Sequence, residues 1–192
     1  AAVALLVDTS FSMVMENRWL PMKRTALALN HLISTRFRSD ALQIIAFGRY
    51  ARTVSAAELT GLEGVYEQGT NLHHALALAG RHLRRHPNAQ PVVLVVTDGE
   101  PTAHLLADGE AAFAWPPRPD TLRATIAEID LLTRYGAVLN VFMLGEDPGL
   151  QRFVDAMARR SGGRVFTPSA RDLGQYVVSD YLRARRGRRR AG

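Results

Sequence analysis

The stretch Ala2-Val-Ala-Leu-Leu-Val7, followed at once by Asp8-Thr9-Ser10-Phe11-Ser12, decides the fold of this chain. Its first part contains only alanine, valine and leucine, which predicts a strand buried on both faces of a parallel sheet. Its second part supplies one carboxylate and two hydroxyls at alternate positions. Ligands of open α/β sheets bind just beyond the carboxyl ends of the strands. We therefore expect Asp8, Ser10 and Ser12 to lie at a binding site.

Two later segments have the same form. Pro91-Val-Val-Leu-Val-Val96 is a second apolar run and leads into Thr97-Asp98-Gly99, and Gly69-Thr70-Asn71 precedes a predicted helix. The three loops together supply the carboxylates of Asp8 and Asp98 and the hydroxyls of Ser10, Ser12 and Thr70. Such an all-oxygen set suits a hard divalent cation, Mg²⁺ in the first place, with Mn²⁺ and Ca²⁺ as alternatives.

The rest of the chain alternates between two patterns. Apolar runs predict strands, and apolar residues at helical spacing predict helices. Strands are expected at 2–7, 41–47, 50–54, 92–96, 138–144 and 164–166, and helices at about 18–38, from 72, from 119, around 150–161 and from 173. This alternation predicts an α/β fold with a Rossmann-like, doubly wound, mostly parallel sheet of about six strands and helices on both faces. The 50–54 segment is expected to form a hairpin onto the sheet edge, while 55–68 and 99–118 are expected to be mostly loop.

The positive charge is concentrated at one end. The formal net charge is +6, and six arginines lie between residues 183 and 190, where no acid occurs. We therefore expect one domain over residues 1–182 and an arginine-rich, disordered tail over 183–192. The alternative is a tail that contacts nucleic acid or acidic partners through nonspecific electrostatic attraction.

Composition excludes several classes of site. There is no cysteine, which excludes disulfides, thiolate zinc sites and thiol nucleophiles and fits a reducing compartment. No apolar run reaches the roughly 18 residues that a membrane span needs. Since the sequence starts on a predicted strand, we also expect no signal peptide or leader within it. We expect a cytoplasmic domain excised from a longer protein, in which case an upstream targeting signal would lie outside this sequence.

The two aspartates strengthen the prediction of a metal site. If the first and fourth strands are neighbours, Asp8 and Asp98 face each other, which is unfavourable unless a cation lies between them. Each residue alone is equally explained as a helix cap or strand end. Five such residues in three loops, all at strand ends or helix starts, favour a common site.

These residues form a recognisable pattern. Asp8-x-Ser10-x-Ser12, Thr70 and Asp98 resemble the metal-ion-dependent adhesion site of von Willebrand factor A (VWA) domains, and the resemblance covers residues 1 to about 182. The Thr97-Asp-Gly-Glu-Pro-Thr102 stretch is similar to bacterial VWA proteins of the magnesium chelatase D subunit and AAA+ ATPase-associated type.

The resemblance implies a protein-binding module and not an enzyme. It implies a Rossmann-like sheet with one antiparallel edge strand, and a bound cation that engages a carboxylate of a partner, with a AAA+ ATPase as the suggested partner. It also implies that Ser10, Ser12 and Thr70 bind the cation directly, Asp8 and Asp98 directly or through water, and that Thr70 has a switching role.

The main alternative is a Mg²⁺-dependent phosphoryl-transfer hydrolase with Asp8 as nucleophile. Such enzymes usually carry a second acid two positions on, where this chain has Ser10, and a lysine at a later strand end, whereas the only lysine is Lys23. Nucleotide-binding glycine motifs are absent.

Five further residues are open to two interpretations each. His73 and His74 are expected to cap a helix or face solvent, with metal ligation as the alternative. Glu100 either tunes the predicted site or solvates its loop. Phe113 and Trp115 either anchor a partner or pin the long 99–118 connection to the domain.

Overall fold

Six strands form the central sheet in the order β3-β2-β1-β4-β7-β8. The structure is a computed structural model, and it describes residues 1–64 and 68–186. The strands are β1 (Ala2–Asp8), β2 (Ala41–Phe47), β3 (Ala51–Val54), β4 (Pro91–Thr97), β7 (Val138–Met143) and β8 (Val165–Phe166). All pairs are parallel except β2–β3, which is antiparallel at one edge. The predicted fold class and the antiparallel edge strand are thus confirmed.

The first strand lies at the centre of this sheet. β1 pairs in parallel with β2 on one side and with β4 on the other, and every residue of β1 is buried. Burial on both faces explains why its sequence lacks the alternation of apolar and polar residues that a half-exposed strand would show.

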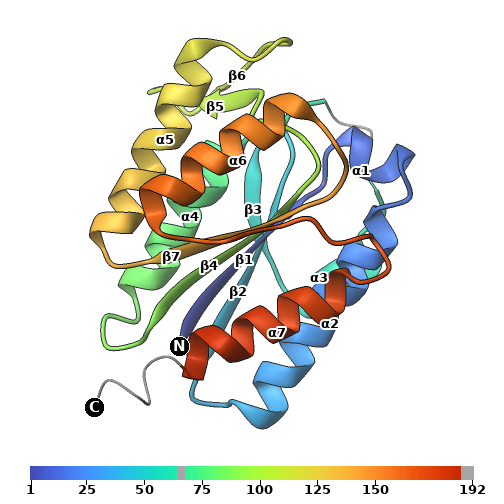
Figure 1. The fold of residues 1–192 in the computed structure, drawn as a ribbon, viewed down its shortest axis with the longest axis vertical. Helices are drawn as coiled ribbons and strands as arrows, with labels where there is room; N and C mark the ends of the chain where they lie inside the picture. The colour runs from blue at the N-terminus through green and yellow to red at the C-terminus, as the bar shows by residue number, and fades with distance from the viewer. Residues whose placement is uncertain (65–67, 187–192) are drawn as a thin grey trace.

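Helices cover both faces of the sheet. They are α1 (Phe11–Met15), α2 (Trp19–Arg36), α3 (Ala56–Gly61), α4 (Leu72–Arg84), α5 (Pro119–Arg134), α6 (Pro148–Ser161) and α7 (Leu173–Arg186). Figure 1 shows α4, α5 and α6 on one side of the sheet and α2, α3 and α7 on the other. Two apolar clusters, one on each face, make up the core. Within the described ranges, no helix is both long and apolar enough to cross a membrane.

Four short elements were missing from the prediction. The 55–68 segment was wrongly expected to be mostly loop, because α3 begins there with a capping box between Ser55 and Glu58 and buries Leu59; residues 65–67 lie outside the described residues. The short helix α1 directly follows Ser10. The 99–118 connection contains a hairpin of two strands, β5 (Ala103–Leu105) and β6 (Ala111–Phe113).

The last helix runs into the stretch that was assigned to a tail. α7 continues to Arg186, and Asp40 accepts hydrogen bonds from Tyr181 Oη and from Arg185 Nε, each at 2.7 Å. Arg185 also stacks on Phe37, with its guanidinium carbon 4.3 Å from the ring centroid. These contacts hold the end of α7 against the domain, while residues 187–192 lie outside the described residues.

Candidate functional site

The candidate site lies at the topological switch point of the sheet, where the order of the strands reverses between β1 and β4. From β1 the chain builds β2 and β3 on one side, and β4, β7 and β8 on the other. The carboxyl ends of β1 and β4 are therefore neighbours that connect to opposite sides, which is the usual ligand position in open α/β sheets. Asp8 is the last residue of β1, and Asp98 directly follows β4.

Asp8 is buried behind the site, and both of its carboxylate oxygens are hydrogen-bonded. Ser10 N donates to Oδ1 at 2.8 Å, and Thr97 Oγ1 donates to Oδ2 at 2.6 Å. Burial, and then the negative charge of Asp98, raise the pKa of Asp8 from 3.8 to about 7. The fold thus holds a carboxyl group where its charged form is disfavoured.

Asp98 is the second carboxylate, and its side chain is also fully buried (0% exposed). Ser12 Oγ donates to its Oδ1 at 2.7 Å, and Arg18 Nη1 donates to its Oδ2 at 2.9 Å. The Ser10 and Ser12 hydroxyl oxygens lie 3.3 Å apart. The two serines and Asp98 thus form one continuous chain of polar contacts.

Arg18 was not predicted as part of the site. Its side chain is 22% exposed and lies over Gly145, which has a positive φ of 95°. A Cβ at position 145 would approach Arg18 Nη2 to 2.8 Å, so glycine leaves the room that the guanidinium occupies. Nothing in the local sequence pattern distinguishes Arg18 from other arginines, because its role depends on contacts distant in sequence.

Thr70 is held in place by the β4–β5 loop. Its amide donates to Thr102 Oγ1 at 2.9 Å, and its carbonyl accepts from the amides of Thr102 and Ala103. The next residue, Asn71, caps α4 by accepting from the His74 amide. These contacts fix the Thr70 backbone while its side chain lines the same cavity as Ser10, Ser12 and Asp98.

This cavity has a volume of about 490 Å³. Its lining comes from five separate segments and consists of Ser10, Phe11, Ser12, Gln68, Gly69, Thr70, Asp98, Gly99, Glu100, Thr102, Phe113, Trp115 and Asp147. The structure therefore brings four of the five predicted ligands to one cavity, with Asp8 buried directly behind them through its hydrogen bond to Ser10.

The histidines have a structural role. His73 Nδ1 accepts a hydrogen bond from the Leu105 amide, and His74 Nδ1 accepts one from the Ala51 amide. Burial lowers the pKa of both imidazoles, which favours the neutral form that such acceptors need. They thus tie α4 to β5 and β3. In the described part of the chain, no group of three or more His, Cys, Asp or Glu residues is arranged to hold a metal.

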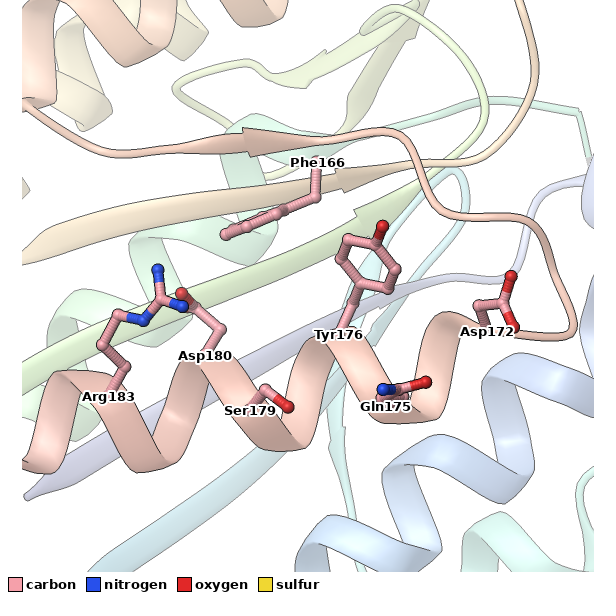
Figure 2. Close-up of a pocket in the computed structure, with 7 residues that line it drawn as sticks. All are labelled: Phe166, Asp172, Gln175, Tyr176, Ser179, Asp180 and Arg183. Atoms are coloured by element: carbon pink, nitrogen blue, oxygen red, sulfur yellow. The ribbon is translucent and has the colours of Figure 1, made fainter.

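Another cavity, of about 440 Å³, lies between β8 and α7. Figure 2 shows Phe166 on the strand side and Tyr176 on the helix side of it, with ring centroids 5.9 Å apart. Its buried acid, Asp180, is already bonded to Asn140 and Arg164. This cavity contains none of the predicted site residues.

The raised pKa of Asp8 predicts a pH dependence of stability in EDTA. Between about pH 4 and 7 the folded protein keeps a proton that the unfolded chain has lost, so stability falls as the pH rises through this window. Asp8→Asn removes this contribution, so its thermal midpoint should fall less than that of the wild type over this window. Asp155→Asn, on α6 away from the cavity, is the control and should follow the wild type. Equal changes of the thermal midpoint with pH in the wild type and in Asp8→Asn would contradict the raised pKa of Asp8.

Comparison with known proteins agrees with the architecture. The family model described as "Rv0959-like protein, vWA domain" matches residues 1–182. The chain is 72% identical over 190 residues to the uncharacterized protein Rv0959 of Mycobacterium tuberculosis, covering 97% of this chain and 28% of that protein's length.

Solved structures share the fold at low sequence identity. The pilus adhesin SpaC of Lactobacillus rhamnosus GG has a TM-score of 0.72 at 15% identity, over 96% of this chain and 30% of that one. The vWF domain of the pilus tip protein Mfa5 of Porphyromonas gingivalis has a TM-score of 0.72 at 12% identity, over 97% of this chain and 95% of that one. Because the family model matches residues 1–182, this chain belongs to the Rv0959-like family of vWA domains.

Proposed function

We propose that this domain is a protein-binding module that engages a carboxylate of its partner through a divalent cation, Mg²⁺ in the first place. One observation carries the proposal: Ser10, Ser12, Thr70 and Asp98 line a single cavity, although they come from three separate loops. Membership of the vWA family supports the role in protein interaction. Dependence on a metal is our inference from the residues.

The side chains present fit a hard dication. The Asp98 carboxylate and the hydroxyls of Ser10, Ser12 and Thr70 would hold the ion, and every one of these donors is an oxygen. Asp8 would act from behind, because its two oxygens are bonded to Ser10 N and Thr97 Oγ1. A bound cation would supply the positive charge that attracts the partner's carboxylate.

The neutral hydroxyl donors leave the dication able to accept a carboxylate from outside at an open coordination position. Asp8 and Asp98 together carry at most two negative charges, and the remaining donors are neutral hydroxyls. A dication held by this set keeps an attraction for another anion, and the open cavity gives a partner side chain access. The chain's own residues would orient the ion and exclude water from its buried side.

The enzymatic alternative has less support. A nucleophilic Asp8 must reach its substrate, yet its residue exposure is 0% and both of its carboxylate oxygens accept hydrogen bonds. The position two residues on is Ser10, which donates its amide to Asp8 and leaves no second acid there. We therefore favour binding over phosphoryl transfer.

The identity of the partner is a separate proposal. The AAA+ ATPase suggested by the resemblance to magnesium chelatase D subunits stays a prediction. The chain spans 28% of the length of its curated relatives, so this prediction concerns the longer protein and not the domain alone. The nucleic-acid alternative depends on the arginine stretch, where Arg185 is engaged with Asp40.

Magnesium should stabilise the wild-type domain. A ligand that binds only the folded state at about 100 times its Kd adds about 2.7 kcal/mol, which is about 5–10 °C for a domain of this size. Asp98→Ala removes the candidate carboxylate ligand that lines the cavity with the hydroxyls, and Asp8→Ala removes the carboxylate behind it, so each should abolish the shift. The Asp155→Asn control should keep it. Equal shifts in all four proteins, measured by scanning calorimetry with Mg²⁺ and with EDTA, would contradict the proposal.

Arg18 should compete with the metal for Asp98. Its guanidinium donates to a carboxylate oxygen of the site at 2.9 Å, and a hydrogen bond to a charged group contributes about 1.5–3 kcal/mol. Arg18→Met should therefore bind Mg²⁺ about tenfold more tightly by isothermal titration calorimetry and be less stable than the wild type in EDTA. The matched control is Arg160→Met, which breaks an exposed pair with Asp130 and should leave metal affinity unchanged. An unchanged or weaker affinity in Arg18→Met would show that the guanidinium does not oppose the metal.

A further inference from the structure

Part of the cavity wall is aromatic and open to solvent. Phe11, Phe113 and Trp115 line the cavity together with the candidate metal ligands. Trp115 is 68% exposed and Phe11 is 41% exposed. Large exposed aromatic residues beside a cavity are typical of binding hot spots, and tryptophan is among the residues most enriched there.

One ring of the aromatic wall, Phe113, is fixed in position before any partner binds. The Arg49 guanidinium lies over the Phe113 ring, 5.1 Å from its centroid, and Arg49 Nε donates to the Gln68 carbonyl at 3.2 Å. The amide of Ala114 donates to the Thr102 carbonyl at 3.0 Å. Phe113 is thus pinned to the loop that carries Thr70, whereas Trp115 stays exposed. A ring held in this way loses little conformational entropy on binding.

Another part of the lining is acidic. Glu100 and Asp147 both line the cavity, and no cation of the described residues forms an ion pair with Glu100. Its carboxylate lies against the first turn of α6, where a Cβ at position 149 would approach Glu100 Oε1 to 2.6 Å. Asp147 caps the same helix by accepting from the Leu150 amide. Two negative side chains are therefore held at the cavity beside the candidate metal position.

The cavity is also larger than a single carboxylate requires. Its volume of about 490 Å³ falls within the range of about 300–1,000 Å³ that is typical of sites for whole small molecules. A partner side chain at the metal position therefore leaves room for a neighbouring residue against the aromatic wall.

We propose that this cavity recognises an exposed peptide segment in which one Asp or Glu is flanked by an aromatic or large aliphatic residue that packs on Trp115, and not by a second acid. This inference rests on the proposed metal-dependent function and specifies its partner. The aromatic wall supplies the affinity for the apolar neighbour, and Glu100 and Asp147 repel a further carboxylate while favouring a basic residue.

A peptide display selection tests the proposal without assuming the direction of the bound segment. The probe is a library of random peptides with one fixed glutamate, selected on the immobilised domain in Mg²⁺ and released with EDTA. We expect the released peptides to be enriched in aromatic or large aliphatic residues at a position next to the glutamate and depleted of additional acids. Selection on Trp115→Ala should lose the apolar enrichment, and selection on Leu131→Ala, which alters a 50% exposed side chain on α5, should keep it.

The affinity of one selected peptide gives the quantitative test. Trp115→Ala should weaken its binding about fivefold or more, as expected for a hot-spot residue, and should leave the Mg²⁺-induced thermal shift unchanged because Trp115 is not among the candidate ligands. Replacing the peptide's apolar neighbour by alanine should weaken binding to the wild type and have little further effect on Trp115→Ala.

The outcomes separate this inference from the function on which it rests. Glutamate peptides with random flanking residues would overturn the aromatic-wall proposal and support the metal-dependent function. A domain that is stabilised by Mg²⁺ but releases no peptides in EDTA would also overturn it. No Mg²⁺-induced stabilisation in the wild type would instead contradict the proposed function itself.

Discussion

The opposition of two buried carboxylates is the constraint on which the rest of this site depends. Asp8 and Asp98 lie at the carboxyl ends of neighbouring parallel strands, and the charge of Asp98 contributes to the raised pKa of Asp8. Two buried negative charges near each other are costly unless positive charge or hydrogen-bond donors compensate them. The chain supplies hydroxyl and amide donors and the guanidinium of Arg18. This arrangement explains why several of the buried polar residues gather at the carboxyl edge of the sheet.

The residues around the two acids form a cavity that can receive a ligand. Ser10 and Ser12 come directly after β1, and the Thr70 loop is fastened to Thr102, so the hydroxyls reach the cavity from backbone that is already fixed. The β5–β6 hairpin is attached to that loop and places Phe113 and Trp115 at the same opening. Figure 1 shows α1 and this hairpin at the same end of the molecule, beyond the sheet. Preorganised oxygen donors and an aromatic wall anchored at Phe113 thus form one binding surface.

Much of this fold and site could be predicted from the sequence, and the exceptions are features that leave no local sequence signal. β1 and β4 were predictable because strands buried on both faces leave uninterrupted apolar runs, and Asp8 and Asp98 stand out as the first acids after them. The doubly wound, mostly parallel sheet followed from the alternation of strands and helices, whereas its strand order came only from the structure. The hairpin and α1 were missed because elements of three to five residues leave too little periodicity.

Arg18 was missed because its role comes from contacts with Asp98 and Gly145, far away in the sequence. The histidines beside Thr70 were expected to cap a helix or face solvent, whereas they accept hydrogen bonds from neighbouring strands.

The most direct test of the central claim is the position of a bound ion. Crystals of the domain grown or soaked with Mn²⁺, which replaces Mg²⁺ and scatters anomalously, should give one strong anomalous peak within bonding distance of Ser12 Oγ and an Asp98 carboxylate oxygen, with Ser10 and Thr70 at the same centre. We expect Arg18 to have moved away from Asp98 in that structure. A peak elsewhere, or an unchanged Arg18–Asp98 pair with no peak in the cavity at millimolar Mn²⁺, would contradict the account.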